Sequence, residues 1–213
     1  MEFINPLATQ YAETFTSPES NLLKEINDRT TKYHSRPDML SGHVQGRTLS
    51  FLSTMAQPKY ILEIGAFVGY SALCLAEGLR PDGELHTIEL TEENAKISRE
   101  NFALSNRNKQ ITLHVGNAVD IIPALNYKWD LVFIDADKMG YVTYYDLVIN
   151  RLSENGIIIT DNVLFHGEVL EKEIKGKFAK AIQDFNIHVA NDSQTDNVLL
   201  TVRDGLMLIK KKK

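Results

Sequence analysis

The sequence predicts a doubly wound α/β fold, a mainly parallel sheet of seven strands with the last strand antiparallel, preceded by N-terminal helices. Three observations predict it. From Lys59 onward, short β-rich runs alternate with segments of helical length, the pattern of βαβ units. Before about Met55, apolar residues follow at helical spacing. The last two β-rich runs are joined only by Arg203 and Asp204, a gap that permits a hairpin but no parallel crossover.

Length and composition limit the number of domains and the class of protein. The 213 residues favour one domain, with residues 1–56 as a helical cover and residues 57–213 as the α/β core. A net charge of −5 provides no cationic surface for nucleic acid, and residues 210–213, all lysine, are expected to form a solvated, fraying tail. Apolar runs are too short to span a bilayer, and residues 1–6 do not resemble a secretory signal. We therefore expect a cytoplasmic protein that binds no membrane.

The N-terminal segment is expected to contain at least two helices. Ser17-Pro18-Glu19 is typical of a helix start, with Ser17 as the N-cap and Pro18 in the first turn. Apolar residues follow between positions 22 and 33, and a second helical stretch continues to Met55. These helices are the expected cover of the sheet.

The expected strands are residues 60–64, 84–89, 111–115, 130–134, 156–160, 197–202 and 205–209. Between them, residues 91–105 have helical length, with Thr91 as a plausible N-cap. Trp129 is expected at the edge of the core, and the tyrosines of residues 141–145 are expected to pack their helix. Ligands of open parallel sheets bind beyond the carboxyl ends of the strands, so the residues after each run are the candidates for a site.

The first strand leads into a turn that Gly65 and Gly69 bracket, which lets the backbone approach a ligand closely. Taken alone, this turn is equally consistent with tight packing. Phe67 stands where the dinucleotide fingerprint has its second glycine, so a nicotinamide dinucleotide is not expected. Glu89 ends the second strand, where a carboxylate can accept both ribose hydroxyls of an adenosine group. We favour this role over capping of the next helix.

Polar side chains also end the fourth and fifth strands. Asp135 follows one strand, and Asp161 and Asn162 follow the other, so two carboxylates and an amide oxygen could meet at one edge of the sheet. Oxygen donors without Cys or His suit Mg²⁺, Ca²⁺ or Mn²⁺, and a cation would relieve the repulsion between the carboxylates. From spacing alone, three unrelated loop residues are an equal alternative, since Asp and Asn are common in turns.

Together and in this order, these segments resemble the class I cation-dependent O-methyltransferases, the family of caffeoyl-coenzyme A and catechol O-methyltransferases and their small bacterial relatives. The resemblance runs from about Met39 to the C-terminus and depends on residues 62–71, 133–145, 161–164 and 198–206. It implies an S-adenosylmethionine-dependent, divalent-cation-dependent enzyme that methylates a hydroxyl of a catechol-like small aromatic of caffeoyl, flavonoid or catechol type. Mg²⁺ is the expected cation, with Ca²⁺ or Mn²⁺ as alternatives, and a homodimer is expected.

The resemblance also implies roles for individual residues. The expected cofactor-binding residues are Met39, Glu63, Gly65, Phe67, Gly69, Ser71, Glu89, Ala118 and Asp135. The expected metal ligands are Asp135, Asp161 and Asn162, and the expected substrate contacts are Phe165 and His166. Asp135 and Lys138 are the expected catalytic residues, with Lys138 as general base. A cation on the catechol oxygens would lower the phenol pKa from about 10, and would lower the pKa of Lys138 as well.

Three positions depart from the family pattern. Gly42 stands where relatives commonly have Pro, Asn117 where they usually have Asp, and Phe165 where they often have Trp. Gly42 predicts a looser N-terminal cover over the cofactor, and Phe165 predicts a shifted substrate preference. Asn117 weakens what the resemblance implies about the residues around the adenine.

Two other functions stay open at this point. The first is methylation of a tRNA hydroxyuridine by the same apparatus, which the acidic balance of the chain disfavours. The second is a nucleotide-binding module without catalysis. The presence of Lys138 together with all three proposed metal ligands argues against such a module.

Overall fold

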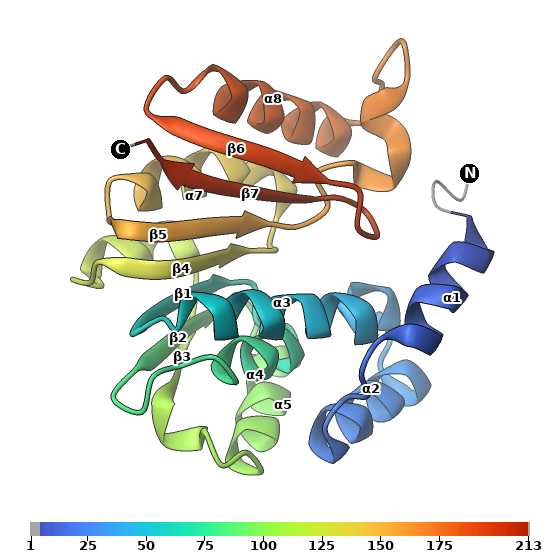
Figure 1. The fold of residues 1–213 in the computed structure, drawn as a ribbon, viewed down its shortest axis with the longest axis vertical. Helices are drawn as coiled ribbons and strands as arrows, with labels where there is room; N and C mark the ends of the chain where they lie inside the picture. The colour runs from blue at the N-terminus through green and yellow to red at the C-terminus, as the bar shows by residue number, and fades with distance from the viewer. Residues whose placement is uncertain (1–4, 213) are drawn as a thin grey trace.

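The computed structural model describes residues 5–212, and its strands form one seven-stranded sheet in the order β3-β2-β1-β4-β5-β7-β6 (Figure 1). The strands are β1 (Tyr60–Ile64), β2 (Glu84–Glu89), β3 (Ile111–Val115), β4 (Trp129–Ile134), β5 (Leu152–Thr160), β6 (Thr195–Leu200) and β7 (Leu206–Lys211). The pairs among β1 to β5 are parallel, whereas β7 is antiparallel to both β5 and β6. The predicted fold class is confirmed, and the last strand inserts between β5 and β6.

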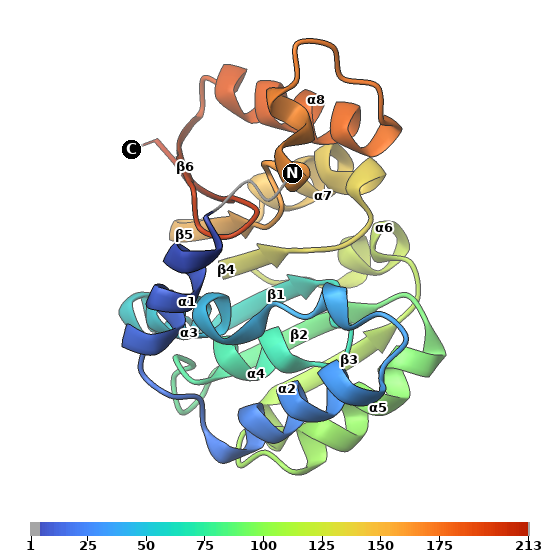
Figure 2. The same cartoon turned by 90° about the vertical axis from the view of Figure 1, so that its right-hand side faces the viewer.

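Helices cover both faces of this sheet (Figures 1 and 2). The α-helices are α1 (Pro6–Phe15), α2 (Asn21–Tyr33), α3 (Gly42–Ala56), α4 (Tyr70–Ala76), α5 (Glu92–Ala103), α6 (Ala118–Ile121), α7 (Tyr141–Ile149) and α8 (Lys177–Asn191). Apolar residues of α2 to α5 pack into one core, and those of α6 to α8 pack into the other. None of the helices in residues 5–212 is long and apolar enough to cross a membrane.

The central strands are buried on both faces because their side chains alternate between the two cores. In β4, Leu131 and Phe133 face the core that contains α4, whereas Val132 and Ile134 face the core that contains α7. This double burial accounts for the nearly continuous apolar runs of the sequence. It also leaves the ends of the strands as the places where polar side chains can reach a ligand, and in a parallel sheet the carboxyl ends form the usual binding edge.

Two expectations about local structure were wrong. Helix α2 begins at Asn21, because the hydroxyl of Ser20 accepts a hydrogen bond from the Leu23 amide and so supplies the N-cap. Ser17 lies in the preceding coil. Trp129 is fully buried in the core rather than at its edge. The predicted cap of α5 is confirmed, since the Thr91 hydroxyl accepts from the Asn94 amide.

The expected lysine tail is also corrected by the sheet. Lys210 and Lys211 belong to β7, where backbone pairing with β6 holds them and Lys210 forms an ion pair with Asp196. The Lys212 amide donates to the Gln194 carbonyl. Residue 213 lies outside the described residues, as do residues 1–4, which are part of the N-terminal stretch where no secretory signal is expected.

Candidate active site

A cavity of about 700 Å³ opens at the carboxyl ends of β1, β2, β4 and β5. Most of the predicted site residues line it: Met39, Gly65, Phe67, Ser71, Glu89, Ala118, Asp135, Lys138, Asp161, Asn162, Phe165 and His166. Glu63 and Gly69 lie behind this lining, in the strand and turn that support it. Met39, Leu40 and Ser41 close the cavity from the N-terminal side. The topology therefore brings together residues that lie far apart in the chain.

The glycine turn after β1 is shaped both by packing and by the cavity. Gly65 has a φ of +103°, and a Cβ there would lie only 1.9 Å from the Asp135 carbonyl oxygen, so no side chain fits. Gly69 has a φ of +82° at the start of α4. Phe67 has a positive φ as well, and its amide donates to Glu89 at 2.9 Å. The two readings of this turn, tight packing and a surface for a ligand, are thus compatible.

Glu89 lies at the cavity wall and is 6% exposed. One carboxylate oxygen accepts from the Phe67 amide, and the other accepts from the amide and hydroxyl of Thr91. Thr91, not Glu89, is the N-cap of α5. Glu89 therefore ties the glycine turn to the end of β2 and holds a carboxylate against the cavity.

Glu63 is a fully buried carboxylate beneath this turn. Its Oε2 accepts from the hydroxyl of Thr87, while its Oε1 has no hydrogen-bond partner within the described part of the chain. Burial raises the pKa of Glu63 to about 7. An unpaired buried carboxylate oxygen is costly unless a donor reaches it, so this position suits a ligand that brings one.

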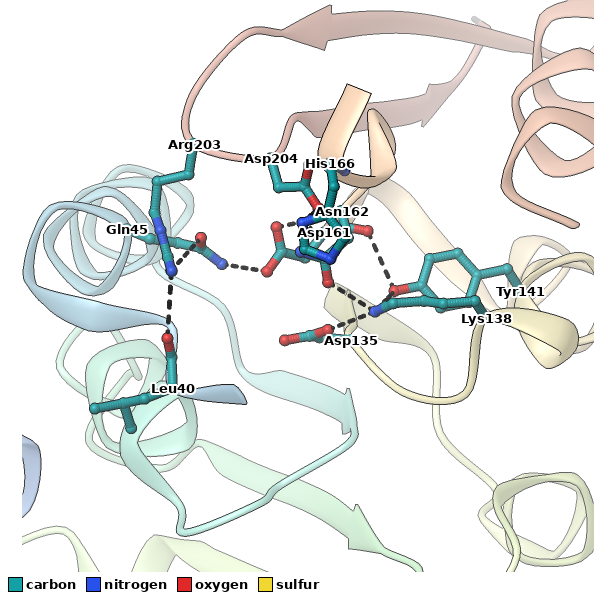
Figure 3. A network of polar contacts seen from close by, with 10 residues as sticks. All are labelled: Leu40, Gln45, Asp135, Lys138, Tyr141, Asp161, Asn162, His166, Arg203 and Asp204. Atoms are coloured by element: carbon teal, nitrogen blue, oxygen red, sulfur yellow. Dashed lines mark hydrogen bonds and ion pairs between the residues drawn. The ribbon is translucent and has the colours of Figure 1, made fainter. Parts of the chain in front are cut away.

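The oxygens of Asp135 and Asn162 converge on the ammonium of Lys138 (Figure 3). Lys138 Nζ lies 2.9 Å from Asp135 Oδ1, 2.7 Å from Asn162 Oδ1 and 2.7 Å from the Tyr141 hydroxyl. Asp161, 3% exposed, lies beside this group. The structure thus brings the three predicted donors together, and they are not unrelated loop residues.

Asp161, Lys138 and Tyr141 all have shifted pKa values, and burial raises that of Tyr141. Burial, followed by the charge of Asp135, raises the pKa of Asp161 above its usual range. Burial lowers the pKa of Lys138, but Tyr141 and Asp135 outweigh it and hold that pKa above its ordinary value. The predicted depression of the Lys138 pKa required a cation. In the structure as it stands, Lys138 is an ammonium that itself compensates the carboxylates.

The donor chemistry fits a hard divalent cation. Within residues 5–212 no three His, Cys, Asp or Glu side chains gather to hold a metal on their own. The set here is instead two carboxylates and an amide oxygen, a combination that Mg²⁺, Ca²⁺ and Mn²⁺ accept with water completing the shell. The position of the Lys138 ammonium shows that a positive charge fits between Asp135 and Asn162.

Comparison with known proteins identifies the family. Residues 12–212 match the model of a family described as O-methyltransferase. The chain belongs to this O-methyltransferase family. A catechol O-methyltransferase from Niastella koreensis is 32% identical over 161 residues, which are 73% of this chain and 72% of that protein. A caffeoyl-CoA O-methyltransferase from Stellaria longipes is 30% identical over 200 residues, 88% of this chain and 82% of that one.

A solved structure agrees with these relatives. The crystal structure of a methyltransferase from Podospora anserina with bound S-adenosylhomocysteine superposes with a TM-score of 0.91 at 30% identity, covering 98% of this chain and 95% of that one. The protein is an S-adenosylmethionine-dependent O-methyltransferase. The alternative of a nucleotide-binding module without catalysis is therefore wrong.

Sequence reasoning missed four residues of this methyltransferase site. Tyr141 packs in the core as expected, but its hydroxyl also contacts Lys138. Gln45, within α3, donates to Asp161 Oδ2 at 2.6 Å. The sequence pattern predicts no role in the site for Arg203 or Asp204, although both form the hairpin connection and Asp204 belongs to the last segment of the resemblance. Both nevertheless contact the site (Figure 3). The available signals for Arg203 and Asp204 were the resemblance of residues 198–206 and the hairpin itself, since a turn after β6 lies at the cavity edge of the sheet.

The three departures from the family pattern have local explanations. Gly42 begins α3 with a φ of +74°, a conformation that proline cannot adopt. Asn117 caps α6 by accepting from the Val119 amide at 3.1 Å, which an aspartate would do equally well. Phe165 and His166 both have positive φ and line the cavity beside the oxygen donors. This part of the methyltransferase wall is built of backbone conformations that side chains rarely adopt.

Proposed function

We propose that the protein is a divalent-cation-dependent O-methyltransferase that acts on a hydroxyl of a catechol-like small aromatic. One observation carries the proposal: Asp135 and Asn162 converge on a single cationic centre, with Asp161 beside them, at the edge of the cavity. The relatives named catechol and caffeoyl-CoA O-methyltransferase support the acceptor class. Mg²⁺ is the favoured cation, with Ca²⁺ and Mn²⁺ as alternatives.

The cofactor would occupy the half of the cavity next to β1 and β2. The proposed contacts are Met39, Glu63, Gly65, Phe67, Gly69, Ser71, Glu89, Ala118 and Asp135. Support comes from Glu89, which holds a carboxylate at the cavity wall, and from Glu63, whose unpaired oxygen suits a donor. The helical segment up to residue 56 would be the cover of a single methyltransferase domain, because Met39 closes the cavity from that side.

The chain's own residues would position the acceptor and remove its proton. A bound divalent cation would lower the pKa of an acceptor hydroxyl and orient it toward the methyl group. Asp135, Asp161 and Asn162 would hold that cation, and Lys138, whose pKa the cation would lower, would accept the hydroxyl proton as a neutral amine at Nζ, which lies beside Asp135 and Asn162. Phe165 and His166 would contact the aromatic ring at the cavity wall. Holding the acceptor oxygen rigidly in line with the sulfonium methyl group converts an intermolecular reaction into a nearly intramolecular one.

The test is a methyl-transfer panel with radiolabelled S-adenosylmethionine over catechols, flavonoids, hydroxycinnamoyl thioesters and tRNA, with Mg²⁺ or with a chelator. We expect transfer to vicinal phenols that the chelator abolishes. Lys138→Met should lower kcat by roughly 10²–10⁴-fold, the usual worth of a general base, without weakening cofactor binding. Unchanged transfer in chelator would overturn the cation requirement. Transfer to tRNA alone would overturn the acceptor class.

The proposal includes a homodimer that uses α1. All ten residues of this helix are exposed, and Leu7, Tyr11 and Phe15 repeat every four residues along one side, exposed by 73%, 67% and 70%. An apolar stripe of this kind on a helix is stabilised when a partner covers it. Tyr11→Ser with Phe15→Ser should shift the sedimentation coefficient from dimer to monomer. Gln10→Ser with Glu13→Ser, on the same helix, is the matched control. Equal sedimentation of both variants as dimers would exclude α1 from the interface.

A further inference from the structure

We infer that the turn between β6 and β7 positions the oxygen donors of the active site, with Asp204 and Arg203 as positioning residues. This inference rests on the proposed cation-dependent function. Asp204 Oδ2 accepts a hydrogen bond from Asn162 Nδ2 at 3.1 Å, while Asn162 Oδ1 faces Lys138 at 2.7 Å (Figure 3). One side of the Asn162 amide is therefore bound by the turn and the other faces the site.

The chemistry of Asp204 determines which end of Asn162 faces the site. An asparagine amide has an oxygen that accepts and a nitrogen that donates, and rotation by half a turn exchanges them. A carboxylate can only accept, so Asp204 selects the nitrogen of Asn162 as its partner and directs the oxygen inward. Only the oxygen can bind a hard cation. Asp204 thereby makes Asn162 a ligand in one orientation only.

Arg203 orients the neighbouring proposed ligand, Asp161, by donating hydrogen bonds where Asp204 accepts them. Its guanidinium can only donate, and Nη1 donates to Gln45 Oε1 at 3.1 Å. The amide nitrogen of Gln45 is thereby turned toward Asp161, whose Oδ2 accepts from it at 2.6 Å. Gln45 is 1% exposed, so water does not compete for its amide. Two adjacent residues of one turn thus orient two amides, one supplying a ligand oxygen and the other holding a ligand carboxylate.

The backbone of the turn is fixed against the segment that follows β5. The Leu164 amide donates to the Asp204 carbonyl at 2.9 Å, and the Val163 amide donates to the Gly205 carbonyl at 3.2 Å. A Cβ on Gly205 would lie 2.7 Å from Leu164 Cγ, which shows how closely the two segments pack. The second oxygen of Asp204 accepts from the His166 amide. The turn is therefore held against residues 163–166, which include the proposed substrate contacts Phe165 and His166.

The experiment compares Asp204→Asn with the wild-type protein by Mn²⁺ titration, followed by electron paramagnetic resonance of the free ion. The new amide can donate, so it permits Asn162 to present nitrogen to the site. We expect the Mn²⁺ dissociation constant to rise roughly 10–100-fold, the usual effect of losing a partner of a metal ligand. The S-adenosylmethionine dissociation constant, measured by calorimetry, should stay within about twofold of the wild-type value. The KM for the cation should rise, and saturating cation should restore kcat.

Asp196→Asn is the matched control, because it removes the same charge from β6 at an exposed ion pair with Lys210. It should bind Mn²⁺ like the wild type. Wild-type Mn²⁺ affinity in Asp204→Asn would overturn the inference while leaving the proposed function standing. Parallel losses of Mn²⁺ and cofactor affinity with a lower melting temperature would reduce Asp204 to a merely structural role. If the wild-type protein bound no Mn²⁺, the inference and the cation requirement would both fall.

A second variant keeps the inference testable if Asp204→Asn does not fold. Arg203→Met leaves Asp161 and Asp204 in place and removes the donor that orients Gln45, together with the hydrogen bonds from Arg203 to the Leu40 carbonyl. It should also weaken Mn²⁺ binding, but by less than Asp204→Asn, because Gln45 only holds the carboxylate of Asp161 whereas Asp204 decides which atom of Asn162 faces the cation. Unchanged Mn²⁺ binding in Arg203→Met would overturn the role assigned to Arg203.

Discussion

At the scale of single residues, Glu63 couples the stability of the protein to pH. Its carboxylate is fully buried, one of its oxygens has no hydrogen-bond partner among residues 5–212, and burial raises its pKa to about 7 in the folded state. In the unfolded chain the pKa returns to about 4.3, so the folded state binds more protons between these values. The contribution of Glu63 to stability is therefore complete below the unfolded pKa and is lost as pH rises through 7.

Glu63→Gln should remove this dependence. The free energy of unfolding of the variant, relative to the wild type, should increase by up to about 3 kcal/mol between pH 5 and pH 8, since each pKa unit is worth about 1.4 kcal/mol. Urea unfolding at several pH values measures the difference. A difference that is independent of pH would show that Glu63 titrates normally.

The sequence predicts some residues of the site and not others for a physical reason. Asp135 and Asp161 follow strands, and parallel strands end at one edge, so topology alone brings them together. Gln45 reaches Asp161 across 116 positions, and Arg203 reaches Gln45 across 158. These two contacts depend on how α3 and the β6–β7 turn pack in three dimensions. A periodicity in the sequence contains no information about that packing.

At the scale of elements, the turn between β1 and α4 depends on Gly65. Gly65→Ala would combine a φ of +103° with a Cβ that lies 1.9 Å from the Asp135 carbonyl oxygen. Gly42→Ala is the matched control, because its φ is also positive at +74° but the nearest atom to its Cβ is 3.9 Å away. Gly42→Ala should cost about 1–2 kcal/mol of stability, and Gly65→Ala should cost clearly more and abolish cofactor binding. Thermal unfolding and calorimetry measure both quantities, and equal costs would contradict the steric explanation.

The bounds of the strands also show where the hydrophobic pattern of the sequence fails to predict the structure. The first and last residues of β1, β2 and β3 are those predicted, because each strand is a short β-rich run with a clear start and end. β5 begins at Leu152, four residues before the predicted start. Its first part, residues 153–155, is polar, and an irregularity in the pairing of β4 and β5 lies between Trp129 and Leu131. The polar residues 153–155 provide no hydrophobic signal, so the sequence pattern does not predict the first part of β5.

At the scale of the whole molecule, Lys138 should let the fold persist without a cation. Its ammonium already neutralises part of the charge of Asp135 and Asp161. We expect a chelator to abolish activity while changing the melting temperature by only a few degrees. Lys138→Met in chelator should lose roughly 3 kcal/mol, as when one partner of a buried ion pair is removed, and Mg²⁺ should restore it. Differential scanning calorimetry of both proteins, with chelator and with Mg²⁺, makes the measurement. Unfolding of the wild type by chelator would contradict this role.

The strand order divides the cavity into two halves of different origin. The wall next to β1 and β2 comes mainly from one stretch of chain, residues 64–118, whereas the opposite wall is assembled from the segments after β4 and β5 and from Arg203 of the β6–β7 turn. Exchange of residues 161–168 together with 200–205 for those of a relative should therefore transfer acceptor preference as a module. Exchange of either loop alone would break the amide contacts between them. Evolution of a new substrate range in such a protein would require paired changes at two distant places in the gene.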